Sequence, residues 1–271
     1  MPATGSKTHI PQNLSIRLRA DGFCFFVCNP HDSSLVRCER FDVGADEDMG
    51  ERLQTELGRP EYFNHNIDQV FVLSTENITH IPLEEFQRES SEAMYELTFN
   101  HPDMEKIHVS YNILPHLETV ELYSIPREVE HAILQYYPTA RFFGAHAMLM
   151  ERLLRLDNEK TDGIRLFFIY PDGDNLTVFH FDNGRLRMSN TFTAHNAPDA
   201  LYFILYAWKT LGLDAERDHC LLLGQTQWLK ELPNYVANII RINPSMLFPN
   251  IPLAKEKDVP LDTAALLLNR L

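Results

Sequence analysis

The chain opens its patterned region with a strict alternation of apolar and polar residues. In "LSIRLRADGFCFFVCNP", residues 14–19 alternate with the two-residue period of a strand that has one covered face and one solvent face, which places Arg17 on the polar side. Asp21 and Gly22 supply the turn, because both tolerate the positive φ of tight hairpins. Residues 23–28 then return as a strand that is apolar on both faces. The stretch predicts a β-hairpin, and "LVRCERFDV" extends it to a three-stranded meander.

The same pattern recurs about 150 residues further along the chain. "GIRLFFIYPDGDNLTVFHFDNG" contains two apolar runs with hairpin turns at "PDGDN" and "DNG". Together with the next run it predicts a second meander, with strands over residues 164–170, 176–181 and 185–193. The sequence therefore suggests that one unit occurs twice.

Each meander is followed by a helix, a short apolar strand and a second helical segment. In the first half these are a helix that Asp46 begins and Gly58 ends in the left-handed conformation, a strand over 68–74 and a helix over 79–99 with Pro82 in its first turn. In the second half they are a helix over 196–212, a strand over 218–224, a short helix or turn over 226–235 and a strand over 236–242. The order β-β-β-α-β-α thus appears twice, which predicts a mixed α/β fold.

Residue matches at similar offsets support the duplication: Arg17-Leu18 with Arg165-Leu166, Asp21-Gly22 with Asp172-Gly173, and Asp68 with Asp218. Between the halves, residues 106–126 predict a strand pair broken at Pro115-His116. Helices are expected over 127–138 and from about residue 144 to 156. We expect an N-terminal half, residues 1–157, that carries the inserted strand pair and extra helices, and a C-terminal half, residues 158–271.

Two such units describe the architecture of actin, the sugar kinases and a chaperone ATPase domain. Over nearly its whole length the chain resembles a bacterial domain-of-unknown-function family with the actin-like ATPase (ribonuclease H-like) fold. The residues that carry the resemblance are "LSIRLRADGFCFFV", "VSYNILPHLETVELYSIP" and "LFFIY...NLTVFHF...N" leading into "DALYFILYAW". The resemblance implies a duplicated fold with a cleft between its halves and no established activity. The pilus and type II secretion assembly proteins are a more distant likeness, by fold only.

Composition narrows the classes of partner. The formal net charge of -14 among 271 residues repels a polyphosphate backbone, so nucleic acid is not expected as a partner. No run of about 18 or more apolar residues occurs, and the first residues lack the apolar region of a secretory signal, so neither the membrane nor export is expected. The four cysteines stand apart at strand positions, which is typical of buried reduced thiols and favours the cytoplasm.

The first hairpin turn departs from the phosphate-binding pattern of the actin-like fold. That pattern needs an acidic residue at the strand end, followed by a glycine and a hydroxyl, so that backbone N–H groups approach the phosphates. Here Asp21 and Gly22 are adjacent and no hydroxyl follows them. A bare hairpin is the stronger interpretation.

The second turn is richer, since Asp172 and Asp174, on either side of Gly173, could offer oxygens to a Mg²⁺ that carries nucleotide phosphates. Such a turn is also common as a purely hydrophilic one. The place of the adenosine-contacting glycine pair holds the single Gly224, followed by Gln225 and Thr226. One glycine there allows close approach of a ligand or simply ends a strand.

Other catalytic constellations are missing from the sequence, which has no GxxxxGK[ST], HExxH or GxSxG. Of the scattered histidines, only His195 and His116 occupy turn-like positions that could face a cleft. We therefore expect no catalytic residue, no resident metal and no cofactor. The sequence favours a non-catalytic scaffold with a degenerate nucleotide site and a protein partner, captured in the cleft or at a sheet edge; Tyr136, Tyr137, Phe142 and Phe143 are candidate anchors. A second copy of the chain is an alternative partner, and the alternative function is an ATPase or kinase that binds Mg-ATP in the cleft.

Overall fold

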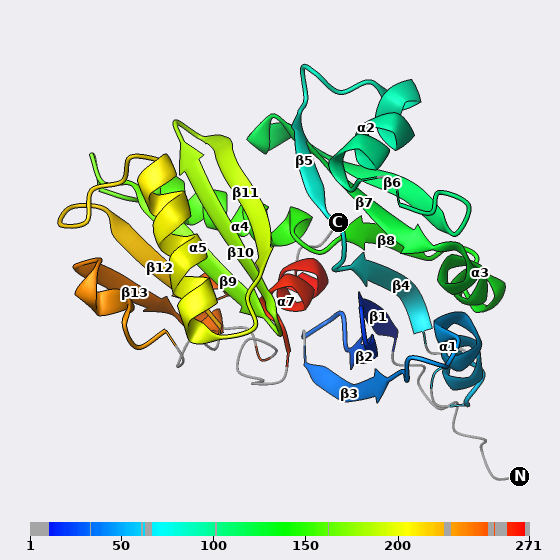
Figure 1. Ribbon diagram of the computed structural model, residues 1–271. Helices are drawn as coiled ribbons and strands as arrows, with labels where there is room; N and C mark the ends of the chain where they lie inside the picture. The colour runs from blue at the N-terminus through cyan, green and yellow to red at the C-terminus, as the bar shows by residue number, and fades with distance from the viewer. Residues whose placement is uncertain are drawn as a thin grey trace, which may run out of the picture.

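Three β-sheets and the helices that cover them make up the molecule (Figure 1). The computed structural model describes residues 11–32, 34–60, 62, 67–100, 102–161, 163–224, 229–248, 252 and 259–268. We call the three sheets the N-terminal sheet, the C-terminal sheet and the inserted sheet. Among the described residues, no helix is both long enough and apolar enough to cross a membrane.

The N-terminal sheet contains the first predicted meander and two further strands. Its order is β3-β2-β1-β4-β8, with β1 antiparallel to β2 and parallel to β4. The strands are β1 (Gln12–Arg19), β2 (Gly22–Cys28), β3 (Leu35–Asp42), β4 (Ile67–Ser74) and β8 (Arg141–Gly144). The predicted meander and the predicted interior strand are confirmed. Cys38 is an exception to the expected buried thiols, because it lies exposed on the edge strand β3.

The C-terminal sheet repeats this arrangement strand for strand. Its order is β11-β10-β9-β12-β13, and β9 again lies between an antiparallel neighbour and a parallel one. The strands are β9 (Leu166–Asp172), β10 (Asn175–Asp182), β11 (Arg185–Thr193), β12 (His219–Leu223) and β13 (Asn238–Ile242). Both five-stranded sheets follow the same order of first appearance along the chain, so the predicted duplicated α/β fold is confirmed.

The sheet registers correct the offset between the two copies. Arg19 pairs with Gly22 to close the first hairpin, and Asp172 pairs with Asn175 to close the second, so Asp172 is the counterpart of Arg19. The expected matches of Arg17 with Arg165 and of Asp21 with Asp172 are therefore wrong, since Arg17 corresponds to Tyr170 and Asp21 to Asp174. Sequence identity alone cannot fix a hairpin register. Asp68 and Asp218 do correspond, one residue before Gln69 and His219, which pair with counterpart positions of β1 and β9.

Helices cover the outer faces of both sheets. On the N-terminal sheet, α1 (Met49–Leu57) and α3 (Arg127–Tyr136) pack onto the apolar outer face, and α5 (Ala197–Thr210) covers the C-terminal sheet (Figure 1). Asp48, rather than the expected Asp46, caps α1 by accepting from the N–H of Glu51. Gly58 ends the helix with a φ of -70°, not in the expected left-handed conformation.

The inner faces of the two sheets share one apolar core. It joins Phe26 and Leu73 of the N-terminal sheet to Phe168 and Phe181 of the C-terminal sheet, through α4 (Ala147–Asn158) and α7 (Leu261–Leu268). In Figure 1, α7 lies between the two sheets. The division at residues 157 and 158 falls at the end of α4 and stays a prediction.

The inserted sheet, of order β5-β7-β6, follows β4 and precedes α3. The expected strand pair is confirmed as β6 (Ile107–Leu114) and β7 (Thr119–Pro126), with η2 (Pro115–Leu117) at the break. The expected helix over 79–99 is wrong in its first half. There β5 (Thr79–Pro82) pairs with β7, and η1 (Arg88–Ser90) and α2 (Ser91–Thr98) follow. Pro82 ends a strand rather than beginning a helix, because the non-local pairing with β7 overrides the local helical period. Leu83 and Leu97 are exposed.

The remaining short elements are η3 (Leu232–Asn234) and α6 (Pro244–Leu247), which flank β13. The predicted helix from residue 144 begins only at Ala147, because Arg141–Gly144 forms the strand β8 instead.

Candidate functional site

The first hairpin turn is held by contacts within its own sheet. The carboxylate of Asp21 is 61% exposed; it accepts from Arg19, and Arg40 Nη2 lies 3.3 Å away. Gly22 has a φ of 144°, and a Cβ at this position would stand 2.0 Å from the carbonyl oxygen of Phe41. The packing of β3 therefore requires a glycine at position 22, and a phosphate-binding role is not needed to explain this residue.

The two aspartates of the second hairpin lie in different environments. Asp172 ends β9, and Asp174 lies in the turn Gly173-Asp174. Gly173 has a φ of 59°, as the first position of a two-residue hairpin turn demands. Asp174 is 70% exposed and pairs with His195 Nδ1 at 3.1 Å, whereas Asp172 turns inward. Asp172 and Asp174 therefore have different partners and do not share one cation. The contacts of Asp21 stay within its own sheet.

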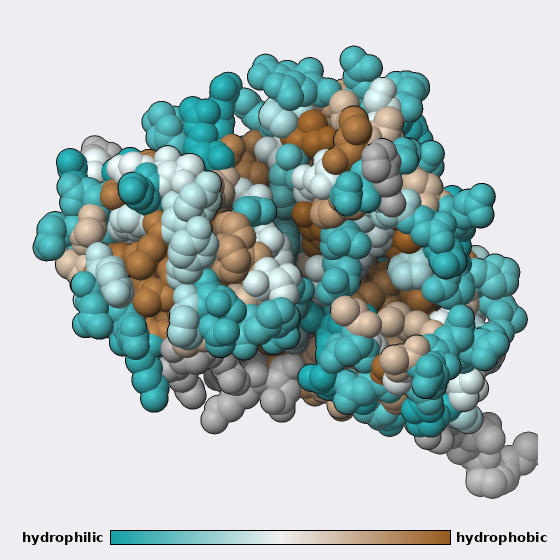
Figure 2. Space-filling model, viewed as in Figure 1, coloured by the Kyte–Doolittle hydropathy of each residue, from teal (hydrophilic) through white to brown (hydrophobic). Residues whose placement is uncertain are grey.

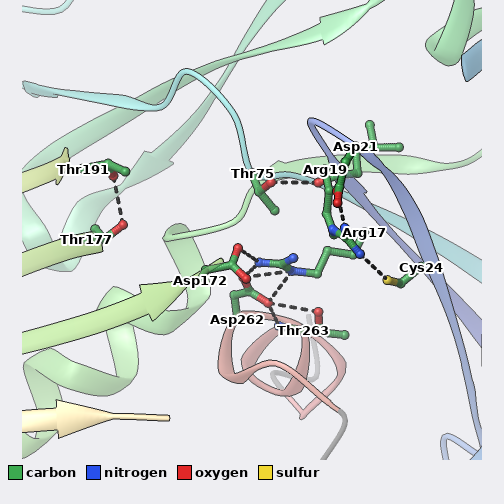
Figure 3. A network of polar contacts seen from close by, with 11 residues as sticks. Arg17, Arg19, Asp21, Cys24, Thr75, Asp172, Thr177, Thr191, Asp262 and Thr263 are labelled. Atoms are coloured by element: carbon green, nitrogen blue, oxygen red, sulfur yellow. Dashed lines mark hydrogen bonds and ion pairs between the residues drawn. The ribbon is translucent and has the colours of Figure 1, made fainter. Parts of the chain in front are cut away.

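A buried arginine fills the space between the two hairpins. Arg17, on β1, is 2% exposed; its Nη2 lies 2.5 Å from Asp172 Oδ2 and 2.7 Å from Asp262 Oδ2, and its Nε lies 3.1 Å from both Asp262 oxygens. Asp262 belongs to α7 and also accepts from the hydroxyl of Thr263 at 3.0 Å. We call these four residues the Arg17 network (Figure 3).

The network satisfies its own charges. Burial disfavours the guanidinium charge, but the carboxylates of Asp262 and Asp172 outweigh it and raise the pKa of Arg17. Burial likewise opposes the charge on Asp262, but Arg17 and the hydrogen bonds from Thr263 outweigh it, and they lower the pKa of Asp262. Arg17 and Asp262 are therefore both charged near neutral pH, and the guanidinium lies between two carboxylates of the same chain.

Glu76, just beyond the end of β4, adds a further carboxylate beside the network. Asn175 and the backbone of Ala20, which belong to the two different hairpins, act on its carboxylate and lower its pKa. Burial and then the charge of Asp172 raise the pKa of Glu76, while Arg17 opposes that shift. Next to it, the hydroxyl of Thr75 donates to the carbonyl of Leu18 at 2.8 Å. The loop after β4 therefore contacts both hairpins.

Gly224, predicted at the place of the adenosine-contacting glycine pair, does not belong to the Arg17 network. Gly224 follows β12 with a φ of 70°, and a Cβ there would meet no atom within 4 Å. Its left-handed conformation ends the strand. Gln225 and Thr226 lie outside the residues that the structure describes.

The remaining residues that the sequence suggested as cleft histidines or aromatic anchors do not belong to the Arg17 network. His195 is exposed beside Asp174, and His116 is exposed in η2. Phe143 lies in the inner core, and Tyr136, Tyr137 and Phe142 pack against the outer core of the N-terminal sheet, so none of them is a free anchor.

Sequence reasoning missed the two central residues of the network. The alternation in β1 placed Arg17 toward solvent, but Ser15 and Arg17 are both buried, because the second face of β1 meets α7 and the C-terminal hairpin. Asp262 carried a usable signal, since it is the one charged residue in the apolar helix "LDTAALLL". A lone carboxylate in such a helix demands a buried partner.

Comparison with known proteins identifies the family. Residues 5–241 match the model of a family described as protein of unknown function, DUF3822. The chain belongs to this family. No curated protein matches the chain.

Solved structures confirm the fold of this DUF3822 chain. A Bacteroides thetaiotaomicron protein with actin-like ATPase fold and unknown function aligns with a TM-score of 0.79 and 25% identity, over 96% of both chains. The PilM-PilN type IV pilus biogenesis complex aligns with a TM-score of 0.54 and 12% identity, over 96% of this chain and 98% of that one. The expected actin-like ATPase fold is confirmed, and the function of the family is not established.

Proposed function

We propose that this DUF3822 protein is a non-catalytic interaction protein in which the nucleotide site of the actin-like fold is replaced by the Arg17 network. The observation that supports this most directly is the position of Arg17, which lies 2% exposed between the two hairpins with Asp172 and Asp262 as its partners. In this arrangement the chain supplies both the cation and the anions.

Phosphoryl transfer depends on positioning and on neutralising the charge of the phosphates. Of the two aspartates predicted as Mg²⁺ ligands, Asp172 is bound to Arg17 and Asp174 lies 70% exposed next to His195. A triphosphate placed between the hairpins would have to displace Arg17 and leave Asp262 buried without its cation. Leaving a buried charge unpaired costs about 3–5 kcal/mol, which opposes nucleotide binding at this place.

A protein partner is proposed because the fold carries an exposed apolar surface on α5. Tyr202 and Tyr206 are 64% and 57% exposed, and their rings lie 6.3 Å apart. Beside them is a groove of about 380 Å³ that α5 forms with the segment Leu229–Leu232. Figure 2 shows apolar atoms beside this helix. The proposed occupant is an apolar segment of another protein. PilM, which shares the fold, is found in a complex with PilN.

A cytoplasmic location is part of the same proposal, since the four cysteines, all of them among the described residues, form no disulfide.

The first test is thermal unfolding with Mg-ATP and with Mg-ADP at millimolar concentration. A ligand at a hundred times its dissociation constant adds about 2.7 kcal/mol to the unfolding free energy, so even weak binding is detected. We expect no change in the melting temperature with either nucleotide. A clear rise that Asp172→Asn removes would overturn the proposal in favour of a nucleotide-dependent enzyme.

The second arm places a photo-crosslinking phenylalanine analogue at Tyr202, with the same analogue at Tyr235 as the control. Tyr235 is 50% exposed and is not part of the groove lining. We expect one discrete adduct at position 202 that is absent at 235, and we expect the purified adduct partner to bind the wild type but not Tyr202→Ala. An adduct with a second copy of the chain would indicate a homodimer. Equal labelling at both positions would count against the surface.

A further inference from the structure

Three side chains from distant segments meet at the junction of the inserted sheet and α4. His80 on β5 pairs across the sheet with Glu121 on β7, and His146 is the residue that caps α4. One ligand atom from each of the three lies within 4.8 Å of the other two. They form a group of two imidazoles and one carboxylate, which we call the His80 cluster.

The cluster is buried, and one polar atom of each side chain lacks a hydrogen-bond partner. Glu121 is fully buried, and the side chains of His80 and His146 are about 6% exposed. Within the described part of the chain, His80 Nε2, Glu121 Oε2 and His146 Nδ1 have no hydrogen-bond partner. Orphaned buried polar atoms are rare in proteins and each one destabilises the fold, so three at one point indicate an absent binding partner.

The surrounding backbone orients the carboxylate and leaves it room. Glu121 Oε1 accepts from the N–H of His146 at 3.1 Å, which fixes the orientation of the carboxylate. A Cβ at Gly144 would stand 2.4 Å from Glu121 Oε2, so only glycine fits beside the carboxylate. Asn112, the neighbour of Glu121 on β6, holds this glycine by accepting from its N–H at 2.9 Å.

The donor set matches a divalent transition-metal ion. Imidazole nitrogen and carboxylate oxygen are ligands of Zn²⁺ and its neighbours, whereas Mg²⁺ and Ca²⁺ prefer oxygen alone. His80 Nε2 and Glu121 Oε1 are 3.5 Å apart, close to the roughly 3.4 Å that separates two ligands of a tetrahedral zinc ion.

The cluster also lacks a fixed counter-charge. Among the described residues, the one ion-pair partner of Glu121 is His80, and no lysine or arginine pairs with it. A dication would offset the buried carboxylate and use the lone pairs of both rings.

We propose that His80, Glu121 and His146 bind one divalent transition-metal ion, of which zinc is the representative, with a water in the fourth position. The ion would join the inserted sheet to the start of α4. The ring of His146 contacts Phe179 of β10 edge-on, with the ring centres 5.4 Å apart, so the ion would also stabilise the contact with the C-terminal sheet.

The test is titration of untagged, chelator-treated protein with Zn²⁺ by calorimetry and with Co²⁺ by visible absorption. We expect one ion per chain and the strong absorption of four-coordinate Co²⁺. Glu121→Gln, which keeps an acceptor for the His146 N–H, and His80→Gln should each weaken binding at least a hundredfold, because even residues behind the ligands change metal affinity by about 10–100-fold.

The control is His108→Gln. His108 forms a His–Glu pair of the same chemistry with Glu130, at 2.7 Å, but this pair is partly exposed and lacks a third ligand. Its replacement should leave Zn²⁺ affinity unchanged. Failure of the wild type to bind one Zn²⁺, or unchanged affinity in Glu121→Gln, would overturn the proposal.

X-ray absorption of the Zn²⁺-loaded wild type decides the question without any variant. We expect two imidazoles, oxygen and no sulfur around the ion. A spectrum with sulfur ligands would assign the metal to the cysteines, and one with fewer than two imidazoles would contradict the cluster.

Discussion

The hairpins of the two sheets share one backbone plan and differ in what their side chains bind. Arg19 and Asp172 are counterparts at the ends of β1 and β9, and each is followed by a two-residue turn. The first turn is tied to β3 by surface arginines, while the second reaches across to Arg17. The same frame thus serves one hairpin as a local turn and the other as a contact between sheets.

The positions two residues earlier make the contrast clearer. By the hairpin registers, Tyr170 of β9 is the counterpart of Arg17 of β1, and both are buried. Burial and then the charge of Asp262 raise the pKa of Tyr170, so the same carboxylate acts on both members of the pair. Duplication therefore preserved two sheets, and divergence at one register position placed a cation in only one of them. This asymmetry teaches that the contact between the sheets is electrostatic as well as apolar.

Among the three predictions, replacing the guanidinium of Arg17 should change the unfolding free energy most. Arg17→Met leaves Asp262 buried without its partner, so we expect the unfolding free energy to fall by about 3–5 kcal/mol in urea titration. Arg17→Met combined with Asp262→Leu should be less destabilised than Arg17→Met alone, because no charge then remains buried. The control is Arg40→Met, which removes a surface pair with Asp42 and should change stability little. If Arg17→Met and Arg40→Met were equal, the network would have no special weight.

The glycines of the two hairpins, Gly22 at the start of β2 and Gly173 in the second turn, provide a second, smaller contrast. Gly22→Ala places a Cβ against the backbone of Phe41 in a conformation that side chains rarely adopt, so we expect a loss of at least about 3 kcal/mol. Gly173→Ala meets no atom within 4 Å and carries only the positive φ, so its cost should be about 1–2 kcal/mol. Urea unfolding of both variants at one pH measures the difference. A larger loss in Gly173→Ala would show that the second turn is the more constrained one.

The smallest of the three effects is expected from acid. The pKa of Asp262 is lower in the folded protein than in the unfolded chain, so its contribution to stability is present above the unfolded value of about 3.9 and is lost as the pH falls through the folded value. The stability advantage of the wild type over Asp262→Asn should therefore shrink below about pH 4. The loss should be partial, since a protonated Asp262 still accepts from Arg17. An advantage that is constant from pH 6 to pH 2.5 would contradict this assignment.

Local patterns in the sequence predicted the sheets because hairpins are local. The alternation before Asp21, the glycine turns at Gly173 and Gly184 and the apolar runs specify meanders from neighbouring residues alone. The same patterns failed at residues 79–82, because β5 is defined by its pairing with Leu122 and other residues of β7, some 40 positions away. The spacing of apolar residues alone could not show that residues 79–82 form a strand rather than the start of a helix.

The site was harder to predict for the same physical reason. Alternation reports that one face of β1 is polar, but it cannot tell water from a buried ion pair, so Arg17 was assigned to solvent. The His80 cluster left no signal at all, since its members are separated by 41 and 25 positions in different elements. Of the predicted nucleotide-site residues that the structure describes, only Asp172 belongs to the network.

The Arg17–Asp262 contact joins residues that are 245 positions apart. During synthesis the guanidinium of Arg17 must therefore stay hydrated, or find temporary acceptors, until the ribosome has released Asp262. Until that moment β1 cannot desolvate its polar face, so the two sheets close around α7 only after every strand of both sheets has been synthesised.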